Sequence, residues 1–137
     1  MKQANISKVV IGKNKQWKTE VNTGVKNNQK FVSIPHARFI DILVYKLRLA
    51  GIDSICNEES YTSKCSFLDN EPIKKRETYL GRRIKRGMFK TSSGKNWNAD
   101  CNGAANILSK AIPNCFTNGI EAIVVSPERV KSFKTAA

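Results

Sequence analysis

The fold is decided by the stretch SIPHARFIDILVYKLRLAGIDSICN, residues 33–57. Pro35 suits the first turn of a helix, where its missing N–H costs nothing, and Gly51 is a typical helix stop. The apolar residues between them recur at helical spacing and predict one buried stripe: Ala37, Phe39, Ile40, Leu43, Val44 and Leu47. Residues 52–57 predict a short strand. The stretch therefore predicts a helix followed directly by a strand.

A β-branched, apolar run at residues 6–11 precedes this helix and ends at Gly12. It predicts a buried strand. Strand, helix and strand in this order form a βαβ unit, which implies parallel strands and a right-handed crossover. Residues 13–30 carry neither a helical nor a strand period and are interpreted as a basic loop. The predicted fold class is α/β.

The C-terminal half predicts less regular structure. Residues 58–78 are polar and irregular, and residues 79–98 resemble a β-hairpin with its turn at Ser93-Gly94. A helix is predicted from Ala99 or Asp100 through Ile112, ended by Pro113. Its expected apolar stripe is Ala104, Ile107, Leu108 and Ala111. Residues 114–137 are interpreted as a weakly ordered tail, with at most a short strand at 123–125.

The charge indicates a polyanionic partner. The formal net charge is +13 and the sequence pI is about 9.9, a bias that costs self-repulsion in the compact state. Nucleic acid is the leading candidate, because an anionic membrane surface would need a basic amphipathic helix. The densest basic cluster spans residues 74–95. No apolar run is long enough to cross a bilayer, and we expect a cytoplasmic, nucleoid-associated protein.

The four cysteines, Cys56, Cys65, Cys101 and Cys115, include no CxxC pair. A structural zinc site usually needs close ligand pairs, so zinc is not expected. Without a secretory signal, a disulfide framework is not expected either. We interpret these residues as reduced cysteines that mostly serve packing.

A few acidic residues stand at informative positions. Glu58 and Glu59 end the second predicted strand, and Asp100 begins the last helix. The carboxyl ends of parallel strands are where sites form, and converging carboxylates are ligands for Mg²⁺ ions that cleave phosphodiesters. The simpler alternative is a capping or dipole role for Asp100 and a solvated Glu pair.

Two segments resemble the TnpB (OrfB) transposases, which are related to type V CRISPR nucleases and to the eukaryotic Fanzor proteins. Residues 59–64, ESYTSK, resemble the E-x-Y-T-S-K segment that enters the family's zinc ribbon. Residues 98–107, NADCNGAANI, resemble the closing D-x-N-A-A-x-N-I segment. The resemblance implies an RNase H-like (RuvC) fold in which guide RNA pairs with target DNA and a three-acid metal site cuts it.

Within this resemblance Asp100 matches the third catalytic acid. Most members place a glutamate where this chain has Gly12, whereas a Fanzor-like subset uses one just before Y-T-S-K. Glu59 matches that position, with Glu58 as the close alternative. Glu59 and Asp100 are thus the predicted catalytic residues and Mg²⁺ ligands of an incomplete site.

The chain also departs from the family. The ribbon's CxxC pairs are absent, and the first catalytic aspartate belongs to an N-terminal strand that the chain lacks. The predicted domains are a partial RuvC-like part at 1–57 and 99–113, a degenerate zinc-ribbon-like β-hairpin insertion at 58–98, and a tail at 114–137. A missing N-terminal half or a partner chain would complete the site.

The predicted nucleic-acid contacts are nine basic residues and one tryptophan. A long, positively charged side chain is sufficient to contact a phosphate. The ten residues are Lys13, Lys15, Trp17, Lys18, Lys64, Arg82, Arg83, Lys85, Arg86 and Lys90. Trp17 has two interpretations, stacking on a base and packing against the sheet. His36 is interpreted as a solvent or capping residue.

Three functions are compatible with these features. The first is the C-terminal part of a transposon-encoded, TnpB-like RNA-guided DNA endonuclease, which binds DNA and guide RNA and cleaves only in the complete protein. The alternative is a stand-alone, non-catalytic DNA- or RNA-binding protein derived from a transposase. A ribosome- or RNA-associated structural protein is the third, but it gives no reason for residues 98–107.

Overall fold

The structure, a computed structural model, describes residues 6–14 and 36–117 of the 137-residue chain. The chain divides into two compact units, Met1–Ser60 and Tyr61–Ala137, and each is described by itself. The predicted contacts Lys15, Trp17 and Lys18 lie outside the described residues, as do Pro35 and the strand predicted at 123–125. Helices and two small sheets, one parallel and one antiparallel, confirm the α/β class.

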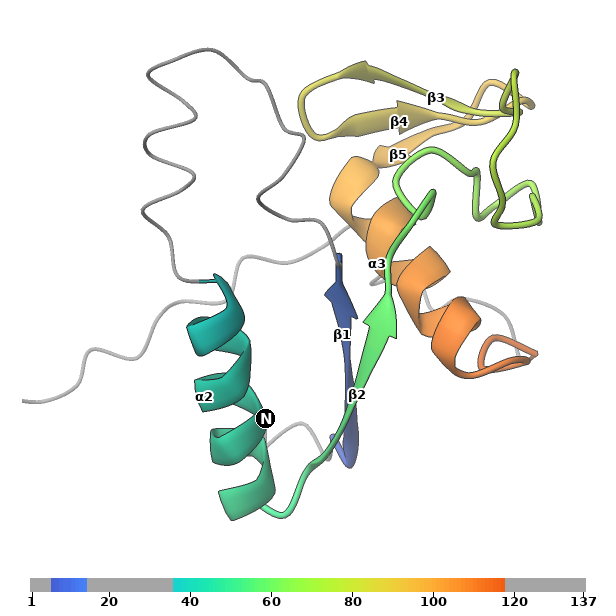
Figure 1. Cartoon of the computed structure of the whole chain (residues 1–137). Coiled ribbons are helices and arrows are strands. Elements are labelled where there is room, and N and C mark those ends of the chain that lie inside the picture. The colour runs from blue at the N-terminus through green and yellow to red at the C-terminus, as the bar shows by residue number, and fades with distance from the viewer. Residues whose placement is uncertain (1–5, 15–35, 118–137) are drawn as a thin grey trace, which may run out of the picture. The chain divides into compact units, whose positions relative to one another are not determined.

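The first unit contains the predicted strand, helix and strand. They are β1 (Lys8–Lys13), α2 (His36–Leu49) and β2 (Asp53–Glu58). The two strands pair in parallel from Lys8 opposite Asp53 to Lys13 opposite Glu58, side by side in Figure 1. The first strand does not stop at Gly12, as the sequence predicts, because Gly12 pairs with Asn57 and the ladder continues for one more residue.

Helix α2 packs against β2 with a narrower face than predicted. Ile40 and Leu47 are buried, and Leu43 and Val44 are half-buried. The prediction that Ala37 and Phe39 belong to this stripe is wrong: both are exposed, Phe39 to 62%. The helical period alone therefore predicts a wider buried face than the one that α2 has.

Strand β1 is half-buried at Val9, Val10 and Ile11 rather than fully buried as expected. Within the described part of the chain its one strand neighbour is β2. The strand therefore keeps one unpaired edge there. Such an edge leaves backbone groups without ladder partners, which small parallel sheets rarely tolerate alone.

The second unit contains a three-stranded antiparallel sheet in which β3 (Arg82–Lys85), β4 (Met88–Lys90) and β5 (Asn96–Asn98) follow in order. The predicted turn is confirmed, because Gly94 has a φ of 85° and its N–H donates to the Thr91 carbonyl at 3.1 Å. The prediction of a single hairpin is incomplete. A second tight turn at Gly87, φ 74°, joins β3 to β4 and adds a third strand.

Helix α3 (Ala99–Ala111) confirms both predicted ends to within one residue. The side chain of Asn98 accepts from the N–H groups of Asp100 and Cys101, so Asn98 is the N-cap. The helix stops two residues before Pro113. Together with Phe89 and Trp97 of the sheet, Ala99 and Ala105 form the core, packed against Phe67, Leu68, Cys101 and Phe116.

The prediction of which face of α3 is buried is wrong. Ala104 is exposed, Ile107 and Leu108 are only half-buried, and the most buried positions of the middle turns include Asn102 and Asn106. Hydrophobic periodicity assigns asparagine to solvent, whereas hydrogen bonds hold these two inside.

Candidate nucleic-acid interface and acidic residues

Two asparagines of α3 tie the helix to the segment that follows Ser60. Asn102 Nδ2 donates to the Cys65 carbonyl at 2.8 Å, and its Oδ1 accepts the Phe67 N–H at 3.0 Å. Asn106 Nδ2 donates to the Thr62 and Cys65 carbonyls at 2.9 and 2.8 Å. The two sequence motifs are therefore linked through buried amides, and all of these residues belong to the second unit.

A buried carboxylate cross-links the loop and the start of the sheet. Glu71 has a fully buried side chain that accepts the N–H groups of Ser66 at 2.8 Å and of Leu80 at 3.1 Å. Arg76 Nε lies 3.8 Å from it. Charge-assisted hydrogen bonds of this kind stabilise a fold strongly. Glu71 thus joins two segments of the chain to each other.

The cysteines divide between packing and exposed positions. Cys65 is fully buried, with its Sγ near the carbonyls of Pro72 and Lys74, and Cys101 packs against the core. Burial raises the pKa of both thiols and keeps them protonated. All four are free, and Cys56 and Cys115 are exposed, so the packing interpretation is wrong for those two.

A second carboxylate holds the turn before β5. Asp69 accepts the Ser92 N–H at 2.9 Å and the Ser92 hydroxyl at 2.7 Å. Desolvation raises the pKa of Asp69, but hydrogen bonds from Ser66 and Ser92 outweigh it and hold the pKa below its ordinary value. The carboxylate is therefore ionised at neutral pH and keeps its hold on the turn.

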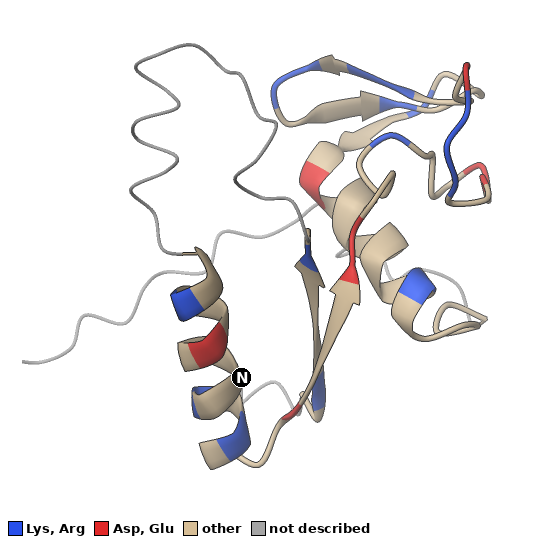
Figure 2. Cartoon of the chain, viewed as in Figure 1, with Lys and Arg blue, Asp and Glu red and all other residues tan. Residues whose placement is uncertain are grey.

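Exposed cations cover the three-stranded sheet. Figure 2 shows them along β3 and into the turn toward β4. Each predicted contact in this region is exposed to solvent: Arg82, Arg83, Lys85, Arg86 and Lys90. Lys64 is also exposed in the second unit, and Lys13 ends β1 in the first unit. The structure thus gathers five of the ten predicted contacts on one small sheet and its first turn.

Asp100 lies beside this basic sheet. Its side chain is 85% exposed, and its Oδ1 is 3.5 Å from a terminal nitrogen of Arg83, which is itself 54% exposed. An exposed pair contributes little to stability. Because Asn98 is the helix cap, the Asp100 carboxylate is not needed for capping and faces solvent next to the cations.

The other predicted acid stands at the carboxyl end of the parallel pair. Gly12 is opposite Asn57, and Glu58 is the last residue of β2. The carboxylate of Glu58 accepts the Ser60 N–H at 2.9 Å and the Ser60 hydroxyl. Glu58 therefore holds a local turn, and Glu59 follows directly after the strand.

A metal centre is not formed within residues 6–14 and 36–117, where no three His, Cys, Asp or Glu side chains gather. Glu59 and Asp100 belong to different compact units. Two carboxylates alone supply too few ligands for a pair of hard divalent ions. The residues present therefore do not by themselves fit a complete Mg²⁺ site.

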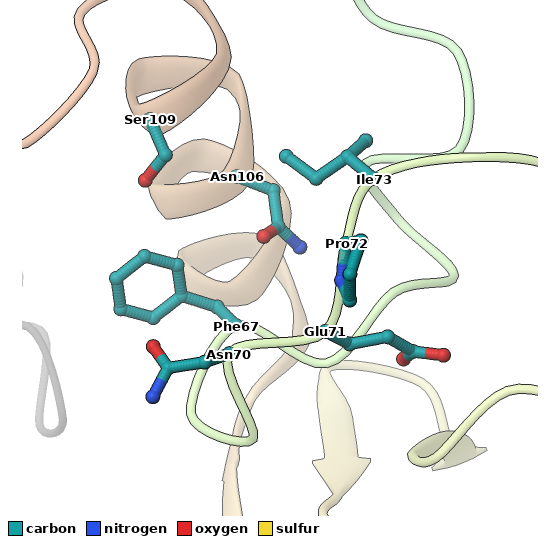
Figure 3. A pocket seen from close by; sticks show the side chains of 7 residues that line it. All are labelled: Phe67, Asn70, Glu71, Pro72, Ile73, Asn106 and Ser109. Atoms are coloured by element: carbon teal, nitrogen blue, oxygen red, sulfur yellow. The ribbon is translucent and has the colours of Figure 1, made fainter.

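A pocket of about 270 Å³ lies between α3 and the loop at 67–73. Figure 3 shows Asn106 and Phe67 in its wall, with the Glu71 carboxylate pointing away from both. Both Asn106 Nδ2 hydrogens are already donated. Because the Glu71 carboxylate points away from Asn106 and Phe67, these pocket residues do not form an acid–base pair.

Residues 36–107, more than half of the chain, match the family model described as the Cas12f1-like TNB domain. The chain belongs to this Cas12f1-like, TnpB-like family. The match begins at α2 and ends at Ile107, the last residue of the second motif, and it confirms the resemblance to TnpB. No curated protein and no solved structure matches the chain.

Among the described residues of this Cas12f1-like chain, no helix is long and apolar enough to cross a membrane. Sequence reasoning missed Asn102 and Asn106 as the link between the motifs, and Glu71 as the link between loop and sheet. The only signal for the asparagines in the sequence is that the second motif, D-x-N-A-A-x-N-I, specifies asparagine at both positions. Nothing in the sequence marks Glu71 as buried.

Proposed function

We propose that the chain is the C-terminal part of a TnpB-like, RNA-guided DNA endonuclease and binds nucleic acid backbones through the basic β3–β4 surface. The supporting observation is the concentration of exposed cations on one three-stranded sheet, of which only Arg83 has an acidic side chain close by among the described residues. Lys and Arg at such positions release counterions when they neutralise phosphates. DNA and guide RNA are the proposed partners.

The proposed fold of the complete protein is RuvC-like, with the βαβ unit as one part of its sheet. The parallel pair ends with Gly12 opposite Asn57, and side chains alternate between faces along a strand. Extended geometry carried on from Asn57 would direct Glu59, not Glu58, to the face of position 12. This alternation makes Glu59 the better candidate for the displaced acid.

Catalysis is proposed only for the complete protein. Glu59 and Asp100 would contribute two of its Mg²⁺ ligands, and the remaining acid would come from a polypeptide segment or partner chain beyond these residues.

Binding is tested by titrating the chain into labelled duplex DNA and single-stranded DNA at several salt concentrations. About six phosphate contacts would reduce duplex affinity on the order of 10³-fold between roughly 50 and 200 mM salt. Replacing Arg83, Lys85 and Arg86 by Ala is expected to lower the salt slope by about one for each phosphate that is no longer neutralised.

A matched control replaces three exposed cations of α2, Arg38, Lys46 and Arg48, by Ala. It removes the same charge, and it should reduce the slope of log affinity against log salt concentration less than the triple variant of the sheet does. An equal decrease of the slope in the two triple variants would show that only net charge matters and would contradict an interface on the sheet.

The alternative is a stand-alone, non-catalytic nucleic-acid-binding protein, which would use the same exposed cations of the three-stranded sheet. The two proposals differ in the role of the acids. A regulator would bind the same targets after Glu59→Ala and Asp100→Ala, whether or not a missing segment is supplied. A nuclease part would lose metal-dependent cleavage in the completed assembly.

A further inference from the structure

A second pocket opens at the edge of the basic sheet. Its volume is about 340 Å³, and its lining contains an aromatic ring, two cations and two hydroxyls: Tyr79, Leu80, Gly81, Arg82, Lys90, Thr91 and Ser92. All of these residues belong to the second unit. The pocket therefore combines a stacking surface with positive charge.

The two cations face each other across the strands. Arg82 on β3 is directly opposite Lys90 on β4. Like charges at directly opposite positions destabilise an antiparallel pair. Neither side chain forms an ion pair with any residue that the structure describes. A bound anion between them would relieve this repulsion.

The aromatic ring is held in place from outside the pocket. The Tyr79 hydroxyl accepts the Arg76 N–H at 3.3 Å, and Lys64 Nζ lies 5.9 Å from the ring centroid. Tyr79 is half-buried and lines the pocket. Rings in this position stack on unpaired bases with little dependence on sequence.

Core packing and hydrogen bonds hold the floor and rim of the pocket. A Cβ on Gly81 would come within 2.4 Å of the buried Phe89 ring, so the backbone there lies directly on the core. Thr91 Oγ1 accepts the Lys95 N–H at 3.0 Å, and Asp69 holds Ser92. A preorganised site loses less entropy when a ligand binds.

We propose that this pocket is a subsite for one unpaired nucleotide, with its phosphate between Arg82 and Lys90 and its base stacked on Tyr79. The inference rests on the proposed function, since it assigns to the basic sheet a preference for single-stranded nucleic acid. Bases inside a duplex remain stacked on each other and cannot reach the ring without being flipped out.

The test uses the full chain with two oligonucleotides of one sequence, a single strand carrying 2-aminopurine and its duplex. Binding of the single strand should quench 2-aminopurine fluorescence as the base stacks. Tyr79→Leu is expected to weaken single-strand binding about 5- to 100-fold and abolish the quenching, with duplex affinity changed less than about twofold. Tyr79→Phe should retain both signals, because the ring remains.

Tyr45→Leu, which replaces an exposed tyrosine of α2, is the matched control and should change neither signal. The double variant Arg82→Gln and Lys90→Gln tests the phosphate clamp without touching the ring, and should weaken single-strand binding more than duplex binding. It also keeps the proposal testable if Tyr79→Leu unfolds, which circular dichroism would show.

The two levels of the proposal fail differently. If the wild-type chain binds neither oligonucleotide, the proposed function fails. If it binds both with a strong salt dependence, but quenching is absent or survives in folded Tyr79→Leu, the subsite is overturned and the general interface remains. Equal weakening of single-strand and duplex binding in the Gln double variant likewise overturns the subsite.

Discussion

Two asparagines show how a polar residue can define a buried helix face. Asn102 and Asn106 stand four residues apart and are exposed to only 0% and 2%. Each amide donates to backbone carbonyls of the preceding loop. A buried polar group costs stability unless it is paired, so the helix and the loop depend on each other for their hydrogen bonds.

Replacing Asn106 by Ala is predicted to lower the free energy of unfolding by about 1–3 kcal/mol, because the Thr62 carbonyl loses the Asn106 donor and the Cys65 carbonyl keeps only the donor of Asn102. Asn96→Ala, at an exposed strand position, should change it by less than about 0.5 kcal/mol. Denaturant titration followed by circular dichroism measures both. Similar losses in the two variants would mean that the buried amide bonds contribute no special stability.

A pair of glycines makes a sharper comparison. At Gly81 an added methyl would lie 2.4 Å from Phe89 Cε1, whereas at Gly103 in α3 nothing lies within 4 Å. Gly81→Ala should therefore destabilise the second unit by about 1–3 kcal/mol through overpacking. Gly103→Ala should stabilise it by about 0.5–1 kcal/mol, since Ala is the better helix former. Thermal melts that shift in the same direction would contradict this local packing.

At the scale of elements, local signals are sufficient for the helices and for the parallel pair. Pro113 marks the end of α3 in the sequence, and the structure ends the helix within one residue of the prediction. The βαβ unit is predictable because strand, helix and strand periods follow one another between residues 6 and 57. These elements depend on interactions between residues that are close in the sequence, so the sequence pattern is sufficient to predict them.

Contacts between distant segments are not predictable in the same way. The buried face of α3 is set by carbonyls at 62 and 65, some forty residues away, and hydrophobic periodicity contains no information on them. Glu71 looks like one more charge in a polar stretch, although both its oxygens accept backbone N–H groups. Charge alone identifies the basic residues of the proposed interface, while the role proposed for Tyr79 depends on the pocket.

At the scale of the whole molecule, the candidate acids divide between the two compact units. Glu59 belongs to the unit that ends at Ser60, and Asp100 to the unit that begins at Tyr61. The family match from 36 to 107 includes both. A cleavage site built from them needs the third acid as well as the correct placement of the units, so nucleic-acid binding and cleavage should be separable properties.

The 137-residue chain is therefore predicted to bind plasmid DNA without nicking it in Mg²⁺ or Mn²⁺. Two metal ions acting together need converging carboxylates, and the described residues supply no group of three. Agarose gels report conversion of supercoiled to open-circular plasmid, and retarded migration in the same samples reports binding. Asp100→Ala serves as the control, and its gel should match that of the wild type. Metal-dependent nicking that disappears in Asp100→Ala would show that the chain completes its own site, and it would contradict the separation of binding from cleavage.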